Sequence, residues 1–166
     1  LVSNTGKVIY SFLFPLDNIF TEGEVIALIN AAIRKCVEHA PEKVRGVGIG
    51  FPGIVDQNIV IGGADNLPGF TNLDLGSLIS ASRTLNVVVD NDANLMGLGE
   101  QFYGAAADCT NVVFLTIGTG IGGGLIIDGK LYGGYKNRGT ELGHITIQQD
   151  GAKCSCGLFG CLEAYA

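Results

Sequence analysis

The sequence has no cluster of basic residues. Its 166 residues include 10 lysines and arginines against 16 aspartates and glutamates, which gives a formal net charge of −6. Proteins that bind a nucleic-acid backbone usually display a basic patch, because the phosphate charges must be neutralised. We therefore expect no nucleic acid to bind through this chain.

The sequence also has no long apolar run. No stretch approaches the ~18 consecutive apolar residues that a transmembrane helix requires. The N-terminal segment LVSNTGKVIY lacks the basic region and apolar region of a signal peptide. Because 47% of the residues are hydrophobic, a folded chain is favoured over a disordered one. We interpret the chain as a soluble, cytoplasmic protein with no membrane partner.

Cysteine is present in an odd number, five, which argues against a closed disulfide framework. Three cysteines and His144 form the pattern H-x9-C-x-C-x4-C, the ligand set of a closed tetrahedral zinc site. A disulfide is the alternative, but it would leave one thiol over and is disfavoured in a reducing cytosol. We predict a structural zinc ion held by His144, Cys154, Cys156 and Cys161, with no open position for a catalytic water.

Strand patterns and helix patterns alternate along the chain, which predicts an α/β fold. Residues 21–40 place apolar side chains on one helical face behind a Thr21–Glu24 capping box. We place a lobe boundary after residue 104, so that residues 1–104 and 105–166 belong to different lobes. The other expected elements are a hairpin in 2–14, strands at 44–50, 86–89 and 111–117, helices at 72–85 and 93–103, and a hairpin that turns at Asp128-Gly129.

The glycine-rich segment GTGIGGG, residues 118–124, matches the G-x-G-x-x-G pattern of dinucleotide sites. Such a site must lead into a helix, whereas the following residues here predict a β-hairpin. A Walker loop is excluded because no Lys-Ser or Lys-Thr follows. Two interpretations remain. Either the exposed backbone N–H groups of the glycine-rich hairpin, with the Thr119 hydroxyl, bind phosphate oxygens, or the glycines allow a tight crossing of strands.

Asn91 and Asp92 lie between a predicted strand and a predicted helix. One interpretation is that one of them only caps the helix. The other is that Asp92 projects from the carboxyl end of the strand, where α/β sheets bind ligands. A carboxylate there accepts the proton of a sugar hydroxyl that attacks a phosphoryl group. Glu141 and Glu163, close to the proposed zinc ligands, are either solvated surface residues or acceptors for the hydroxyls of a polyol.

Five motifs resemble those of the ROK family of repressors, open reading frames and kinases. They are GIGFPGIVD at 48–56, NLPGF at 66–70, DNDAN at 90–94, GTGIGGG at 118–124, and ELGH at 141–144 with CSCGLFGCLE at 154–163. The resemblance implies an actin-like ATPase (ribonuclease H-like) fold with two lobes around a cleft. It implies that Asp92 is the catalytic base, that Gly118, Thr119 and Gly120 bind phosphate, and that the sugar is contacted by Asn66, Asn91, Glu141, His144 and Glu163.

The expected function is ATP-dependent phosphorylation of a hexose or N-acetylhexosamine, with Mg²⁺ on the phosphates and a homodimer or homotetramer as the assembly. Family kinases begin with a D-x-G-G-T motif, and this sequence starts after that point and stops before the second lobe is complete. We therefore expect no turnover from this portion alone. The alternative function is the sugar-sensing domain of a ROK-family transcriptional repressor. A zinc-stabilised interaction module would leave Asp92, Glu141 and the glycine-rich segment unexplained.

Overall fold

The computed structural model describes residues 1–15, 21–64, 67 and 69–166. The chain divides into two compact units, Leu1–Asp92 and Ala93–Ala166. This division falls before the boundary expected at residue 104, because the helix α3 has its contacts with the second unit. The assignment of 1–104 and 105–166 to two lobes of the complete protein stays a prediction. In the described part of the chain, no helix is both long enough and apolar enough to cross a membrane.

The first unit is built on a parallel pair of strands, β1 (Gly46–Phe51) and β5 (Asn86–Asn91). Their register runs from the pair Gly46–Asn86 to the pair Phe51–Asn91. Parallel neighbours require a long crossover connection, and here the chain between the two strands supplies it. The parallel pair with its flanking helices confirms the predicted α/β class.

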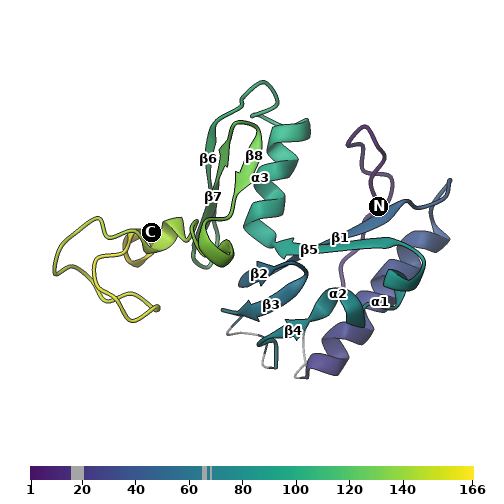
Figure 1. Cartoon of the computed structure of the whole chain (residues 1–166), viewed down its shortest axis with the longest axis horizontal. Coiled ribbons are helices and arrows are strands. Elements are labelled where there is room, and N and C mark those ends of the chain that lie inside the picture. Colours follow the sequence, from purple (N-terminus) through teal and green to yellow (C-terminus); the bar gives the residue numbers. More distant parts are fainter. Residues whose placement is uncertain (16–20, 65–66, 68) are drawn as a thin grey trace. The chain divides into compact units, whose positions relative to one another are not determined.

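Helix α1 (Glu22–Glu38) begins as the sequence predicted. The Thr21 hydroxyl accepts a hydrogen bond from the Glu24 N–H, and the Glu24 carboxylate accepts one from the Thr21 N–H at 2.9 Å. Val25 is the buried residue of this helix and belongs to the hydrophobic core of the first unit. In Figure 1, α1 lies along one side of the β1–β5 pair. The hairpin expected in residues 2–14 is reduced to one antiparallel bridge, between Val2 and Val8.

The crossover after β1 forms a small antiparallel sheet in the order β2-β3-β4. The helix expected at 72–85 is wrong, because this segment starts as a strand that pairs with β3 and then forms two short helical pieces. Ile79 separates the two pieces in an extended conformation, with its side chain fully buried. The elements are β2 (Ile54–Asp56), β3 (Ile59–Gly62), β4 (Leu73–Asp74), α2 (Leu75–Leu78) and η1 (Ser80–Arg83).

The second unit packs helix α3 (Asp92–Tyr103) on an antiparallel sheet. The Phe114 ring occupies the space where a Cβ would lie at Gly97 of the helix and at Gly124 of the sheet. Glycine at both positions therefore lets the helix approach the sheet closely. The hairpin turn at Asp128 and Gly129 is confirmed, since both have positive φ, 51° and 73°. The strands are β6 (Val112–Ile117), β7 (Ile121–Ile127) and β8 (Lys130–Tyr132).

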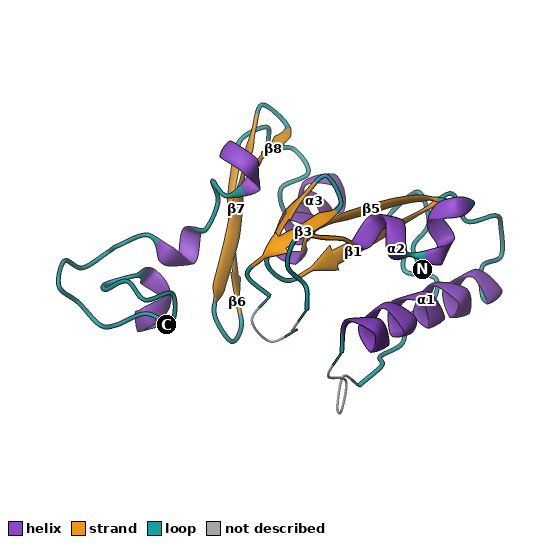
Figure 2. Ribbon diagram, turned by 60° about the horizontal axis from the view of Figure 1, so that its bottom comes forward, coloured by secondary structure: helices purple, strands orange, loops and turns teal. Residues whose placement is uncertain are grey.

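The last part of the chain has almost no regular structure, and Figure 2 shows it as loops with short helical turns. The turns are η2 (Tyr135–Asn137), η3 (Leu142–His144) and η4 (Leu162–Tyr165). Its large apolar side chains Ile145, Ile147, Leu158 and Phe159 are all more than half exposed, whereas Cys154 and Cys161 are buried. The order of this segment therefore depends on contacts other than a hydrophobic core.

Candidate functional site

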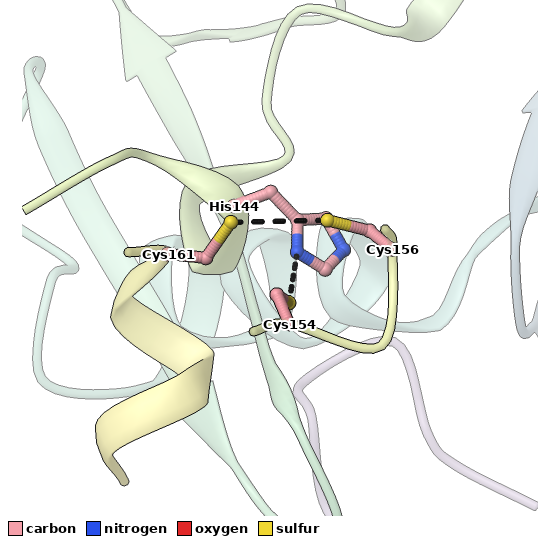
Figure 3. Close-up of side chains that lie close together, drawn as sticks. All are labelled: His144, Cys154, Cys156 and Cys161. Carbon is pink, nitrogen blue, oxygen red and sulfur yellow. Dashed lines mark hydrogen bonds between the residues drawn. The ribbon is translucent and has the colours of Figure 1, made fainter. Parts of the chain in front are cut away.

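Four side chains of the C-terminal segment converge, as Figure 3 shows: His144, Cys154, Cys156 and Cys161. Their candidate ligand atoms all lie within 4.8 Å of one another. His144 Nδ1 is 3.6 Å from Cys154 Sγ, and Cys156 Sγ is 3.8 Å from Cys161 Sγ. The structure thus brings together all four residues of the pattern H-x9-C-x-C-x4-C.

These distances fit a zinc ion. With Zn–S bonds of about 2.3 Å and Zn–N bonds of about 2.0 Å, neighbouring ligand atoms of a tetrahedron are about 3.5 to 3.8 Å apart. The separations of 3.6 Å and 3.8 Å fall at these values. All three cysteines of the cluster are free thiols, so the disulfide alternative is not the arrangement found. The donor set of one imidazole and three thiols is that of a structural zinc site.

The backbone of the loop explains how the cysteines meet. The Cys154 N–H donates to the Leu158 carbonyl at 2.8 Å, and the Gly157 N–H donates to the Cys154 carbonyl at 3.0 Å. Gly157 has a φ of 90°, a conformation that only glycine adopts without strain. This tight turn carries Cys156 back toward Cys154. An antiparallel bridge between Thr146 and Cys161 then brings the third cysteine beside the segment that follows His144.

The thiols of the cluster differ in acidity. Hydrogen bonds, chiefly from the Cys156 backbone, lower the pKa of the Cys154 thiol to about 7. Burial raises the pKa of the Cys161 thiol to about 11. Cys154 is therefore more readily ionised than Cys161. A bound divalent cation would favour the thiolate form of each cysteine.

Glu163 joins the cysteine loop to the start of β7. One carboxylate oxygen, Oε2, accepts a hydrogen bond from the Ile121 N–H at 2.9 Å, and Oε1 accepts one from the Ser155 hydroxyl at 3.0 Å. Oε1 is also 3.8 Å from Cys154 Sγ. The bond from Ile121 is the main cause of a Glu163 pKa below its ordinary value. The residue is thus a half-buried carboxylate and not a solvated surface charge.

The glycine-rich turn connects β6 to β7, and the next residues form a strand, as predicted. The Gly118 N–H donates to the Gly120 carbonyl at 3.0 Å, which makes the turn tight. Gly118 and Thr119 are exposed. At Gly120 a Cβ would overlap the Glu163 carboxylate, so a close approach requires glycine here. Phosphate binding by this turn stays a prediction.

Asn91 and Asp92 occupy the junction between β5 and α3 in the first unit. Asp92 is exposed at the first position of α3, where the helix dipole attracts negative charge. The Asn91 side-chain amide donates to the Gly53 carbonyl at 2.8 Å, and the Asn91 N–H donates to Asp90 Oδ1 at 2.7 Å. Asp92 therefore lies at the carboxyl end of a parallel strand, as the sequence predicted.

Glu141 and Asn66 are the other two residues predicted to contact the sugar, and the structure describes only the first of them. Glu141 is exposed directly before η3, and its carbonyl accepts a hydrogen bond from the His144 N–H at 3.0 Å. Asn66 lies outside the described residues.

The structure also shows positioning residues that the sequence did not reveal. The Asn58 side chain accepts a hydrogen bond from the Val89 N–H at 2.7 Å and so holds β5 shortly before Asp92. Ser155 supports Glu163. Only Asn58 had a local signal, because asparagine is frequent in turns with positive φ, and its φ is positive in the structure.

The first unit is of the α/β class, with a carboxylate at a strand-to-helix junction, and comparison with known proteins makes the assignment specific. The chain belongs to the ROK family, whose profile matches residues 19–166. The resemblance seen in its motifs is therefore confirmed, and with it the actin-like ATPase fold.

Both kinases and regulators are among the similar proteins. A glucokinase of Thermotoga maritima is 37% identical over 169 residues, covering 100% of this chain and 52% of that protein. A xylose repressor of Caldicellulosiruptor bescii is 37% identical over 173 residues, covering 100% of this chain and 43% of that protein. The chain thus spans about half the length of the curated relatives it matches.

The similar solved structures also include both kinases and regulators. A ROK family glucokinase from Streptomyces griseus in complex with glucose and AMPPNP matches with a TM-score of 0.82 and 36% identity, covering 99% of this chain and 52% of that one. A ROK family transcriptional regulator homologous to the E. coli MLC protein matches with a TM-score of 0.74 and 31% identity, covering 90% of this chain and 38% of that one.

Proposed function

We propose that the complete protein is an ATP-dependent sugar kinase that phosphorylates a hydroxyl group of a hexose or N-acetylhexosamine. The observation that carries the proposal is the exposed Asp92 carboxylate at the end of β5 and the start of α3. As a general base, it accepts the proton of the attacking sugar hydroxyl, which contributes about 10²- to 10⁴-fold to the rate. The similarity to the Thermotoga maritima glucokinase and to the glucokinase bound to glucose and AMPPNP supports this role.

As the family motifs imply, Asn66, Asn91, Glu141, His144 and Glu163 each contact the sugar in the complete protein. Zinc is held by His144 and the three cysteines of the loop, with His144 using Nδ1, the ring atom near Cys154. The other ring nitrogen of His144 is then available to a sugar hydroxyl. The metal is structural, and it sets the direction of the imidazole, as residues around a metal commonly orient one another. A carboxylate such as Glu163 has further acceptor capacity beyond its two hydrogen bonds within the protein.

ATP binds with Mg²⁺ on its phosphates, and the backbone of Gly118, Thr119 and Gly120 contacts phosphate oxygens. Segments of the complete protein other than residues 1–166 supply the remaining ATP contacts, as the length of the relatives suggests. The complete protein is a cytoplasmic homodimer or homotetramer with residues 1–104 and 105–166 in two lobes.

The test uses the complete protein, ATP, Mg²⁺ and a panel of hexoses and N-acetylhexosamines. A sugar that binds only the native state raises the melting temperature, so thermal shift identifies the ligand first. We expect that sugar, and not its poorly binding isomers, to cause ADP release in a coupled assay. Sugar binding without ADP release above the background of ATP alone would contradict the kinase proposal.

The second candidate is the sugar-sensing domain of a ROK-family repressor. The observation in its favour is the Caldicellulosiruptor bescii xylose repressor, which matches the whole chain at the same identity as the glucokinase. A repressor would bind operator DNA through another segment and release it when the sugar binds. An electrophoretic mobility assay with and without the sugar found by thermal shift separates the two functions.

A further inference from the structure

Ile121, the residue that follows the glycine-rich turn, is held from two sides by the C-terminal segment. Its N–H donates to Glu163 Oε2 at 2.9 Å. Its carbonyl lies against Gly143, where a Cβ would overlap the carbonyl oxygen. Ile121 itself is 8% exposed. The end of the glycine-rich turn is therefore fixed by residues more than twenty positions away, in addition to the β6–β7 hairpin.

The residues that hold Ile121 are neighbours of the proposed zinc ligands. Ser155, which donates to the second Glu163 oxygen at 3.0 Å, lies between Cys154 and Cys156 in the sequence. Gly143 directly precedes His144. The position of the Glu163 carboxylate therefore depends on the conformation that the four ligands impose on the loop.

We infer that Glu163 is a positioning residue that couples metal binding to the glycine-rich turn. The bound ion fixes Ser155 and the loop around it. These fix the Glu163 carboxylate, and the carboxylate fixes the Ile121 N–H and with it the turn of Gly118, Thr119 and Gly120. A hydrogen bond from an N–H to an ionised acceptor is among the stronger ones in proteins, so one bond is sufficient for this coupling.

Two features favour coupling over incidental packing. The Gly120 backbone approaches the carboxylate so closely that a Cβ would overlap Oε2, so the fit includes the turn itself. Both carboxylate oxygens accept a hydrogen bond, one on the side of the turn and one on the side of the cysteine loop. The inference rests on the proposed zinc site, and it assigns to Glu163 a role separate from sugar contact.

The experiment measures hydrogen exchange of single amides by NMR in the complete protein, with the zinc content determined before and after chelation. We expect removal of zinc to increase exchange of the Ile121 amide about tenfold or more, as loss of one charge-assisted hydrogen bond allows. The amides of Val112 and Ile126, which pair with each other at the far end of the same hairpin, serve as internal controls and change little. They also report whether the unit remains folded.

Variants separate the coupling from metal binding. In Glu163→Ala, Ile121 exchanges rapidly even with zinc bound, whereas Glu163→Gln restores part of the protection because its amide oxygen still accepts the N–H bond. Ser155→Ala keeps all four metal ligands and gives intermediate protection. Lys153→Ala, an exposed change beside Cys154, is the matched control and leaves exchange unchanged.

Two results would overturn the inference, and they can be distinguished by the zinc content. Protein that binds no zinc overturns both the zinc site and the coupling. Protein that binds zinc but shows the same Ile121 exchange after chelation, or in Glu163→Ala, overturns the coupling alone.

Discussion

The Asn91 side-chain amide donates a 2.8 Å hydrogen bond to the carbonyl oxygen of Gly53, 38 positions away in the sequence. Asn91 ends β5, and Gly53 lies in the turn that follows β1. The bond therefore closes the carboxyl end of the parallel pair, directly beside Asp92. Asn91 has a structural role there in addition to the sugar contact that we propose.

Replacement of Asn91 by alanine tests this structural role. Loss of the bond leaves the Gly53 carbonyl without this donor, so we expect Asn91→Ala to lower the free energy of unfolding by about 1 kcal/mol. Urea denaturation of the complete protein provides the measurement. Asn86→Ala, at the exposed start of the same strand, is the control, with an expected change within about 0.5 kcal/mol. Equal effects of the two substitutions would refute the role.

Helix α3 offers two glycines that differ in their surroundings. At Gly97 a Cβ would overlap the Phe114 ring, whereas at Gly99 nothing lies within 4 Å. We expect Gly97→Ala to destabilise the protein by about 1 to 3 kcal/mol through overpacking. Gly99→Ala should stabilise it by roughly 0.5 to 1 kcal/mol, because alanine is the better helix former. Thermal unfolding of both variants should show melting temperatures shifted in opposite directions, and shifts of the same sign would argue against the packing described.

The roles of Asp92 and the nearby Asp90 can be distinguished by replacing each with asparagine. As general base, Asp92 should be indispensable, so we expect Asp92→Asn to reduce kcat by about 10²- to 10⁴-fold while sugar binding persists. In Asp90→Asn the new side chain keeps an oxygen that can accept the Asn91 N–H, so most of the activity should remain. A coupled ADP assay and calorimetric sugar binding provide the two readouts. An Asp92→Asn protein with nearly normal turnover would remove this residue as the base.

Zinc affinity should depend on pH with a known sign. Protons compete with the metal for thiolates, and the Cys154 thiol, with a pKa of about 7, is protonated below that pH. We therefore expect affinity to fall from pH 8 to pH 6 by about tenfold or more, with proton release on binding. Competition with a chromogenic chelator measures the affinity, and calorimetry in buffers of different ionisation enthalpy measures the protons.

Substitutions of cysteine complete this test. Cys154→Ser should abolish zinc binding at micromolar metal. Cys36→Ser, in the first unit and outside the cluster, should leave the zinc content at one ion per chain. Zinc retained by the first variant or lost from the second would contradict the ligand set.

Short-range patterns in the sequence predicted much of the fold. The Thr21–Glu24 capping box, the Asp128-Gly129 turn and the glycine stop after Tyr103 are local signals, and the structure has each of them. The segment 72–85 was mispredicted as one helix, because pairing of Leu73 and Asp74 with β3 is a long-range contact that overrides local propensity.

The candidate site likewise has features that local sequence patterns predict and contacts that they do not. The convergence of the four candidate ligands could be predicted because zinc coordination dictates residue type and spacing, so one short segment of sequence contains the whole pattern. The bonds from Ile121 to Glu163 and from Asn91 to Gly53 could not be predicted. Each bond joins residues about forty positions apart, and the sequence around one partner does not indicate which residue is the other.

The separation of Ile121 from Glu163 has a consequence for the nascent chain. The acceptor lies 42 residues after the donor. At a synthesis rate of about 5 to 20 residues per second, the β6–β7 hairpin, which ends at Ile127, is made roughly 2 to 7 s before Glu163. Hairpins form within microseconds, so this hairpin can form on the ribosome before the Glu163 carboxylate has been synthesised. Translation speed therefore sets how long the unfinished turn is exposed to chaperones and proteases.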